Sequence, residues 1–438
     1  MADGAASVDL AAVIDRSRMG WTQVLVTALC ATALFVDGYD IQVMALAVPA
    51  LAKGWSLPPS SFGLALSAVV IGISVGSGLI GPLGDRVGRR AMLVATMAGI
   101  GVATACTALA ATPGQFVIWR FLTGLALGAG IPSCAALTSE YAPLRNRSFV
   151  MGLMNVTSPV GAFCAGFIAP PVLEAFGWRG AFLIGGAAPV VIAVIAALTA
   201  PESLKFLLVR RPSDPRIGQI LGRIAPDIDP STVAVGAVEG APGASPQALL
   251  APPYLRRTLL LWWMLALNLF NLYVLISWLP TLLRQSGWSM AAALQGAVLI
   301  QAGGVVGGLT MARFLDRGAT RQALVVGFVL SAASLCLFMA VPSGAAWVAL
   351  LLILGAGVSG SQLSLNALSA AYYPPAIKAT GVAWALLIGG IGSIVAPIAG
   401  GWMLEAHLST IAILGLLAIP ALINAACVGL MRQEWQAH

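Results

Sequence analysis

Twelve long apolar runs constrain this chain more strongly than any other feature of its sequence. Each is close to the roughly 20 residues that a helix needs to cross the hydrocarbon core of a bilayer. Backbone polar groups in lipid must be satisfied within the segment, and runs of this length favour helices over the shorter strands of a barrel. The sequence therefore predicts an all-α membrane protein with twelve transmembrane helices. The runs begin near Trp21, Pro58, Ala91, Gln115, Phe149, Arg179, Thr258, Met290, Gln322, Ala346, Thr380 and Ser409.

The composition agrees with this class and argues against several kinds of site. Hydrophobic residues make up 59% of the chain and charged residues only 9%, whereas soluble domains are about 25% charged. The six cysteines lie inside apolar runs without CxxC spacing, and there are only two histidines. This pattern predicts neither a disulfide nor a metal site. We expect no cofactor and no enzymatic activity, because the sequence offers no Ser/His/Asp, Cys/His or metal-ligand constellation.

The basic residues are divided unequally between the two sides of the predicted membrane. Of the 23 Lys and Arg residues, 19 fall in termini and loops on one side, and only Lys53, Arg179 and Arg284 fall on the other. Short loops rich in Lys and Arg stay in the cytoplasm. We therefore expect an inner-membrane protein with both termini and the long loop in the cytoplasm. This topology explains the net charge of +7, so no nucleic-acid partner is predicted.

The two halves of the chain resemble each other. Gly128-Ala129-Gly130 is echoed by Gly355-Ala356-Gly357 at a spacing of 227 residues. Related halves of a transporter place a substrate site between them, near the membrane midplane. We therefore expect two pseudo-symmetric six-helix bundles, residues 1–200 and 258–438, joined by a cytoplasmic linker, residues 201–257.

The linker differs in composition from the rest of the chain. Residues 224–253 are rich in Pro, Ala and Gly and poor in aromatic residues. Such a composition is typical of a flexible, partly disordered tether. A short amphipathic helix is expected just before it, near Ile217–Ile224.

Two carboxylates interrupt the first apolar run. Asp37 and Asp40 are three residues apart, so on a helix they share a face. An Asp near the centre of a spanning helix costs roughly 2.5 to 3.5 kcal/mol on insertion scales. Both side chains are therefore expected to avoid lipid. They form either a polar pair that only packs against another helix, or a proton-binding site on a transport path.

Three stretches carry a resemblance to a known family. Gly81–Arg90, with its echo at Ala312–Arg321, resembles the cytoplasmic loop signature of the major facilitator superfamily. Asp37-Gly38-Tyr39-Asp40 and the stretch Arg120–Gly128 are similar to the first and fourth helices of its aromatic acid:proton symporters. The resemblance covers essentially the whole chain. It implies import of a small aromatic carboxylate, hydroxybenzoate-like or a related lignin-derived acid, by proton symport with alternating access. Asp37 and Asp40 would then couple transport to protons.

The loop signature also implies a cytoplasmic gate. Arginines of the signature can pair with carboxylates at helix ends, and such pairs would have to break when that side opens. The alternative is that these charges only set the topology. The residues expected at the gate are Asp85, Arg86, Arg89, Arg90, Glu140, Glu202, Asp316 and Arg317.

Arg120 is the one basic residue placed within a predicted helix. The resemblance makes it a candidate to bind the substrate carboxylate, which a guanidinium can grip with two hydrogen bonds. The alternative is an arginine that snorkels to the membrane interface. Polar and aromatic residues in the second half are candidates to bind the ring, although any one of them could instead join two helices. They are Asn268, Asn271, Tyr273, Trp278, Gln301, Gln362 and Asn366.

The chain departs from the family pattern at two places. Several members of the family carry an arginine about where this chain has Gly389-Gly390, and a histidine in the loop that here reads Gly318–Arg321. The glycines remove one possible carboxylate anchor and leave Lys378 near the cytoplasmic end. This departure leaves room for a bulkier or differently anchored acid.

Two other functions remain open from the residues. Proton-coupled efflux of drugs or aromatic compounds occurs in the same superfamily, but Ser158-Pro159 stands where efflux members have a Gly-Pro pair. A transporter-derived sensor would need a signalling domain, which the linker does not resemble. A neutral-sugar substrate fits poorly with charges inside the membrane. The expected partners are the aromatic acid, protons and the lipid bilayer, and the chain is expected to act as a monomer.

Overall fold

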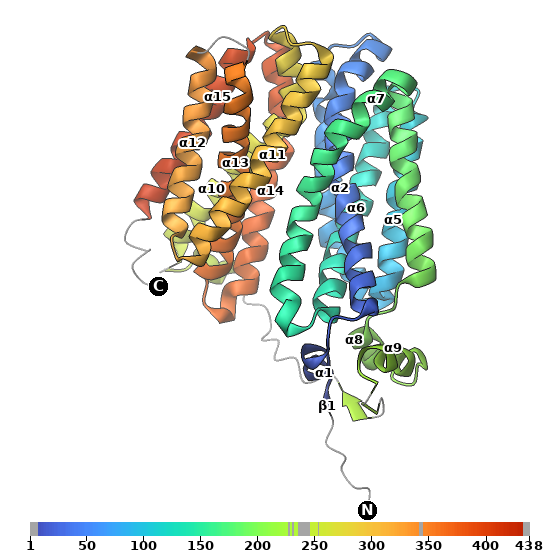
Figure 1. Cartoon of the computed structure of the whole chain (residues 1–438). Coiled ribbons are helices and arrows are strands. Elements are labelled where there is room, and N and C mark those ends of the chain that lie inside the picture. The colour runs from blue at the N-terminus through green and yellow to red at the C-terminus, as the bar shows by residue number, and fades with distance from the viewer. Residues whose placement is uncertain are drawn as a thin grey trace, which may run out of the picture. The chain divides into compact units, whose positions relative to one another are not determined.

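A computed structural model describes residues 8–226, 228–229, 232–234, 246–252, 254–340 and 345–431. These residues are almost entirely helical (Figure 1). The long helices of the first part are α2 (Trp21–Trp55), α3 (Gly63–Val75), α5 (Arg89–Ala108), α6 (Pro113–Tyr141) and α7 (Leu144–Thr199). Those of the second part are α10 (Leu255–Gln285), α11 (Met290–Asp316), α12 (Thr320–Ala340), α13 (Ala345–Tyr372), α14 (Pro375–Glu405) and α15 (Thr410–Leu430).

Eleven helical segments in the described residues are long and apolar enough to span a membrane. One of them, α7, has 56 residues and contains a non-helical residue, Gly177, with φ 65° and ψ −175°. The pieces before and after Gly177 are each long enough to cross a bilayer, so α7 accounts for two crossings. The all-helical membrane fold with twelve crossings is thereby confirmed.

Local sequence explains where some helices begin. Thr112 precedes α6, and its hydroxyl accepts a hydrogen bond from the backbone N–H of Gln115 at 3.3 Å. The Gln115 side chain in turn accepts one from the N–H of Ala111 at 2.9 Å. Pro113 occupies the first turn, where its missing N–H costs nothing. This reciprocal capping satisfies donors that the first turn leaves free.

The signature stretch 81–90 forms a tight connection between α3 and α5. The helix passes through η2 (Gly76–Ile80) and η3 (Gly81–Leu83) into the short α4 (Gly84–Val87). Gly88 follows with φ 111°, a conformation that side chains with a Cβ rarely adopt. The turn at Gly88 directs the chain into α5 at once.

Contacts divide the chain into two compact units. Unit 1 comprises residues 1–38, 71–161 and 182–239, and unit 2 comprises residues 39–70, 162–181 and 240–438. Their boundaries run through α2, α3 and α7, and only one of them, between residues 239 and 240, falls in the expected linker. The division into residues 1–200, 201–257 and 258–438 therefore stays a prediction.

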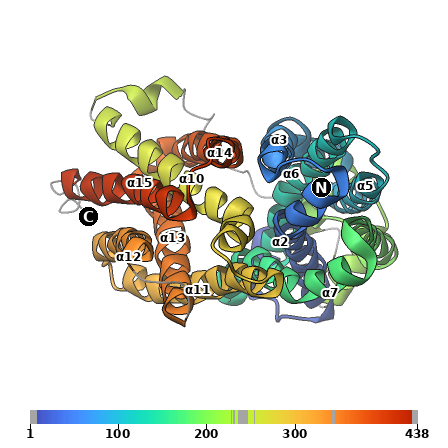
Figure 2. The same ribbon diagram turned by 90° about the horizontal axis from the view of Figure 1, so that it is seen from above.

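Each unit is held by pairs of packed helices. In unit 1, α5 packs against α6. In unit 2, α11 packs against α13 and α10 against α14, and α12 lies beside α13 and α15 (Figure 2). A buried apolar cluster in unit 2 draws on α10, α12, α13, α14 and α15, with Leu265, Phe328 and Leu365 among its members.

The repeated glycines have the same packing role in each unit. A Cβ atom at Gly128 on α6 would collide with the backbone oxygen of Ile73 on α3. A Cβ atom at Gly355 on α13 would collide with the backbone oxygen of Ile300 on α11. The pairs Gly128–Gly355 and Ile73–Ile300 share the spacing of 227 residues. Small residues let membrane helices approach closely, so the sequence repeat reflects one helix contact used twice.

A small layer of short elements lies at one end of the helices of unit 1 (Figure 1). It contains α1 (Leu10–Arg16), α8 (Leu204–Arg210) and α9 (Arg216–Ile224), with the strands β1 (Val8–Asp9) and β2 (Val233–Ala234) paired in parallel. The carboxylate of Asp15 on α1 pairs with Arg147 at the start of α7. The early linker is therefore joined to the N-terminal segment within unit 1.

The amphipathic helix expected near Ile217–Ile224 is confirmed by α9. Its apolar face is buried through Ile217, Ile220, Leu221 and Ile224. Just before it, hydrogen bonds from the Arg216 guanidinium hold the pKa of Asp214 at about 2. Residues 235–245 of the expected tether, and the terminal Arg432, lie outside the described residues.

The repeated glycine contact leads to a testable prediction. Gly128→Ala and Gly355→Ala should each lower the free energy of unfolding by roughly 1 to 3 kcal/mol, because the added methyl forces two helix backbones apart. Titration of SDS into mixed micelles of the purified protein measures this change. Gly152→Ala on α7 is the matched control, because a Cβ there meets nothing within 4 Å. Unchanged stability in both variants would contradict the shared contact.

Candidate functional site

Asp37 and Asp40 lie on α2 and are buried, with 9% and 5% of their surface exposed. The Ser158 hydroxyl on α7 donates a hydrogen bond to Asp37 Oδ2 at 3.1 Å. Hydrogen bonds compensate for part of the cost of removing a carboxylate from water. Helix contact therefore brings a hydroxyl to the first carboxylate of the pair. Sequence analysis noted Ser158 only as part of an efflux comparison and missed this contact.

Glycines set the closeness of the α2–α7 crossing around Asp37. A Cβ at Gly38 would collide with the backbone oxygen of Ser158, and a Cβ at Gly161 would collide with the backbone oxygen of Phe35. The two contacts are reciprocal and lie on either side of the Asp37–Ser158 hydrogen bond. A glycine next to Asp37 and a glycine three residues after Ser158 are the sequence signal that could have revealed the contact.

Arg120 is fully buried in α6, with none of its surface exposed. The carbon at the centre of its guanidinium lies 5.4 Å from the centre of the Phe182 ring. Phe182 in turn meets Phe116 edge to face, with ring centres 5.6 Å apart. A cation over an aromatic face is attracted by the ring's quadrupole, whose face is partially negative. The full burial contradicts the alternative that Arg120 snorkels to the membrane interface.

Three of the ring-binding candidates form a chain of hydrogen bonds in unit 2. Asn268 Nδ2 on α10 donates to Gln362 Oε1 on α13 at 2.9 Å. Gln362 Nε2 donates to Asn366 Oδ1 one turn further along, at 3.1 Å. Asn268 is buried, Gln362 is half-buried and Asn366 is exposed. The chain therefore ends in an exposed amide, which can both donate and accept hydrogen bonds.

Two other candidates join helices. Asn271 Nδ2 donates to the backbone oxygen of Leu417 on α15 at 2.9 Å. Trp278 Nε1 donates to the backbone oxygen of Pro397 on α14 at 2.9 Å. Both side chains are buried, and their donors are used between helices. These contacts agree with the structural alternative for Asn271 and Trp278.

The remaining candidates and the family departure are also placed. Gln301 Nε2 on α11 lies 3.5 Å from Gln42 Oε1 on α2, and sequence analysis missed Gln42. Tyr273 is half-buried, and Lys378 is exposed in the first turn of α14. A Cβ at Gly389 would meet side-chain atoms of Leu265 and Leu269 at 3.1 to 3.2 Å, so this glycine serves the packing of α14 on α10.

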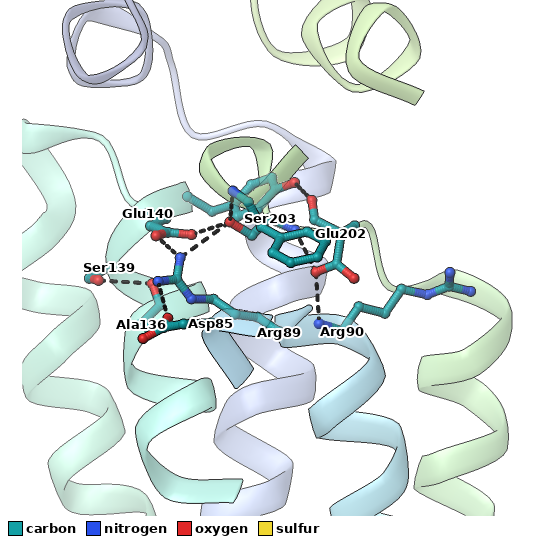
Figure 3. A network of polar contacts seen from close by, with 10 residues as sticks. Asp85, Arg89, Arg90, Ala136, Ser139, Glu140, Glu202 and Ser203 are labelled. Carbon is teal, nitrogen blue, oxygen red and sulfur yellow. Dashed lines mark hydrogen bonds and ion pairs between the residues drawn. The ribbon is translucent and has the colours of Figure 1, made fainter. Parts of the chain in front are cut away.

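Charged residues of the expected gate gather where α4, α5, α6 and α8 meet (Figure 3). The Arg89 guanidinium forms ion pairs with Glu140 and with Asp85, the latter at 3.1 Å. The Arg89 and Glu140 side chains are only 13% and 17% exposed, whereas Asp85 is 72% exposed. The Ser203 hydroxyl donates to Glu140 Oε2 at 2.6 Å and accepts from Arg89 at 3.2 Å. Ser203 therefore belongs to this network, and like Ser158 it is a contact that sequence analysis missed.

Glu202 is tied to the same end of unit 1 by backbone groups (Figure 3). Its Oε1 accepts hydrogen bonds from the N–H of Arg90 at 3.0 Å and of Ser203 at 2.9 Å. The Tyr141 hydroxyl donates to the backbone oxygen of Glu202 at 2.6 Å. The Arg90 guanidinium instead donates to the backbone oxygen of Ala197. Arg90 therefore meets Glu202 through its main chain and not through its charge.

Two other expected gate residues, Arg86 in α4 and Arg317 in the turn after α11, are exposed in the part of the chain that the structure describes. The side chain of Asp316, at the end of α11, lies outside the described part of the structure. Among the described residues, no group of three or more His, Cys, Asp or Glu side chains could hold a metal ion.

Known proteins are similar to this chain over nearly its full length. The family model described as Major Facilitator Superfamily matches residues 30–317 and 297–434. The chain is 34% identical to the 4-hydroxybenzoate transporter PcaK of Acinetobacter baylyi, over 99% of this chain and 95% of the relative. It is 32% identical to a gallate transporter of Pseudomonas putida, over 97% and 95%.

A solved structure shows the same fold at low sequence identity. It is a bacterial homologue of the human lysosomal transporter Spinster in an inward-facing, occupied conformation. The TM-score is 0.71 at 18% identity, covering 94% of this chain and 97% of that chain.

The buried ion pair leads to a second prediction. Arg89→Ala and Glu140→Ala should each destabilise the purified protein, because each leaves the other charge buried and unpaired. Combined, they should cost less than the sum of the two, with a coupling of roughly 1 kcal/mol or more in the free energy of unfolding. Asp85→Ala is the control and should cost less than about 1 kcal/mol, because that partner is exposed. Strict additivity of the two losses would disprove the coupling.

Proposed function

Because the chain belongs to the major facilitator superfamily, we propose that it imports a small aromatic carboxylate across the inner membrane together with protons. Full-length similarity to transporters named for 4-hydroxybenzoate and gallate carries this proposal. The two buried carboxylates on α2 support the proton part, because carboxylates inside spanning helices are groups that transporters use to carry protons. A hydroxybenzoate-like acid, or a related lignin-derived one, is the proposed substrate.

The topology and the cycle are part of the same proposal. The excess of basic residues on one side supports termini and linker in the cytoplasm. The repeated helix contact supports two related bundles, residues 1–200 and 258–438. The bundles are proposed to work by alternating access, and the chain to act as a monomer. The Arg89–Glu140 network would then lie at the cytoplasmic end of the first bundle. There it would favour closure of that side until the pairs separate.

Arg120 and the Asn268–Gln362–Asn366 chain are the proposed substrate contacts. A carboxylate that leaves water needs a compensating cation, and Arg120 is a buried one. The exposed amide of Asn366 suits a ring hydroxyl, because an amide can donate to or accept from it. The hydrogen bonds that Asn271 and Trp278 make to neighbouring helices support a structural role for both side chains. Tyr273 and Gln301 remain ring-contact candidates.

The proton proposal is tested by replacing each carboxylate. Asp37→Asn and Asp40→Asn keep the shape of the side chain but cannot bind a transported proton. At least one of them should abolish accumulation of labelled 4-hydroxybenzoate against a gradient. Exchange of labelled for unlabelled acid at equal concentrations should persist, because it needs no proton gradient. A protonophore should stop accumulation by the wild-type chain. Full uphill transport in both single variants would rule the proposal out.

The anchor proposal is tested at Arg120. Arg120→Lys keeps the charge but loses the planar fork. This variant should therefore fail to take up the acid, and its affinity for the acid should fall at least about tenfold. The amide of 4-hydroxybenzoate should not compete with the acid, since it lacks the negative charge. Binding is measured by tryptophan fluorescence of purified protein, and folding by its elution in size-exclusion chromatography. Wild-type affinity in a folded Arg120→Ala variant would show that the acid is anchored elsewhere.

A further inference from the structure

We propose that Ser158 is a positioning residue for the proton-binding carboxylate of Asp37, holding it in both its charged and its neutral form. This inference rests on the proton symport proposed above and assigns a partner to one of its two carboxylates. Its basis is the hydrogen bond from Ser158 Oγ to Asp37 Oδ2, at 3.1 Å between α7 and α2.

The backbone holds the two side chains in register. Gly38, the residue after Asp37, packs so closely against Ser158 that a Cβ there would collide with the Ser158 backbone oxygen. Gly161, one turn after Ser158, packs in the same way against the backbone oxygen of Phe35. With these two contacts the helices cannot slide along each other without a collision. The distance between the hydroxyl and the carboxylate is therefore set by main-chain packing.

A hydroxyl is suited to a group that gains and loses a proton. When Asp37 is charged, Ser158 donates its hydrogen to the carboxylate. When Asp37 is protonated, the acid can donate to Ser158 Oγ, because a hydroxyl also has acceptor lone pairs. The hydrogen bond is thus kept in both states, and only the position of one hydrogen changes. The bond to the charged state is the stronger of the two.

Other titratable groups surround Asp37 and have to be separated from the effect of Ser158. From α6, the Cys134 thiol interacts electrostatically with Asp37 and hydrogen-bonds with Cys30 on α2. On α2 itself, Tyr39 and Asp40 follow in the next turn. Thr138 on α6 contacts both Cys30 and the sulfur of Met154 on α7.

The direction of the expected effect follows from the stronger bond to the charged state. Removing the hydroxyl in Ser158→Ala destabilises the charged carboxylate more than the neutral acid, so the site keeps its proton up to a higher pH. The pH at which uptake is half-maximal should therefore move upward, by about one unit. A merely structural role would lower the rate at every pH and leave this midpoint in place.

The experiment measures initial uptake of labelled 4-hydroxybenzoate as a function of external pH, over the range in which the acid stays ionised. Ser158→Ala should raise the midpoint, and Ser158→Thr, which keeps the hydroxyl, should restore it. Thr157→Ala is the matched control, because it removes from the neighbouring residue a hydroxyl that donates within α7, to the Leu153 oxygen. Cys134→Ser tests the neighbouring thiol. Immunoblots of membranes measure the amount of each variant.

A second comparison keeps the inference testable if Ser158→Ala is poorly produced. Ser158→Cys offers a weaker donor and should give a smaller upward shift. In an Asp37→Asn background, the pH profile of acid exchange should not change when Ser158→Ala is added. An unchanged midpoint in produced Ser158→Ala and Ser158→Cys proteins would overturn the role of Ser158. If uptake by the wild-type chain depended neither on pH nor on the protonophore, that result would instead overturn proton symport itself.

Discussion

The cost of placing charge inside helices that cross a hydrocarbon layer is the constraint on which the rest of this protein depends. Asp37, Asp40 and Arg120 all lie in spanning helices, and all are buried by protein. The surroundings differ with the charge. A hydroxyl from α7 meets the Asp37 carboxylate, and the face of Phe182 meets the guanidinium. Each contact replaces part of what water would supply.

Close helix packing is what makes such contacts possible in a membrane. Lipid tails give apolar side chains little reason to associate, so helices are joined by small residues and buried polar groups. Gly38 and Gly161 bring α2 and α7 together next to Asp37, and Gly128 and Gly355 repeat one contact in the two units. Asn271 and Trp278 add hydrogen bonds from α10 to its neighbours. Packing and chemistry therefore use the same positions.

The charged residues at the end of unit 1 differ from those inside the spanning helices, because one of their partners is exposed. Asp85 is largely exposed and contributes little, whereas Arg89 and Glu140 are mostly buried and depend on each other. Ser203 links this pair to the start of α8, where its hydroxyl also accepts from the N–H of Phe206. The network thus couples the signature stretch to the beginning of the linker.

The sequence by itself determined the class of the protein, the placement of its spanning helices, the helix α9 and the family, because hydrophobic length, amphipathic period and signature motifs are local properties. It also singled out Asp37, Asp40 and Arg120, and it included Arg89 and Glu140 among the expected gate residues. Only the tertiary structure decided that Arg120 is fully buried, that Asn271 and Trp278 join helices, and that Ser158 and Ser203 belong to polar contacts. Those roles depend on partners far away in the chain. A serine in an apolar run looks the same in sequence whichever helix it meets.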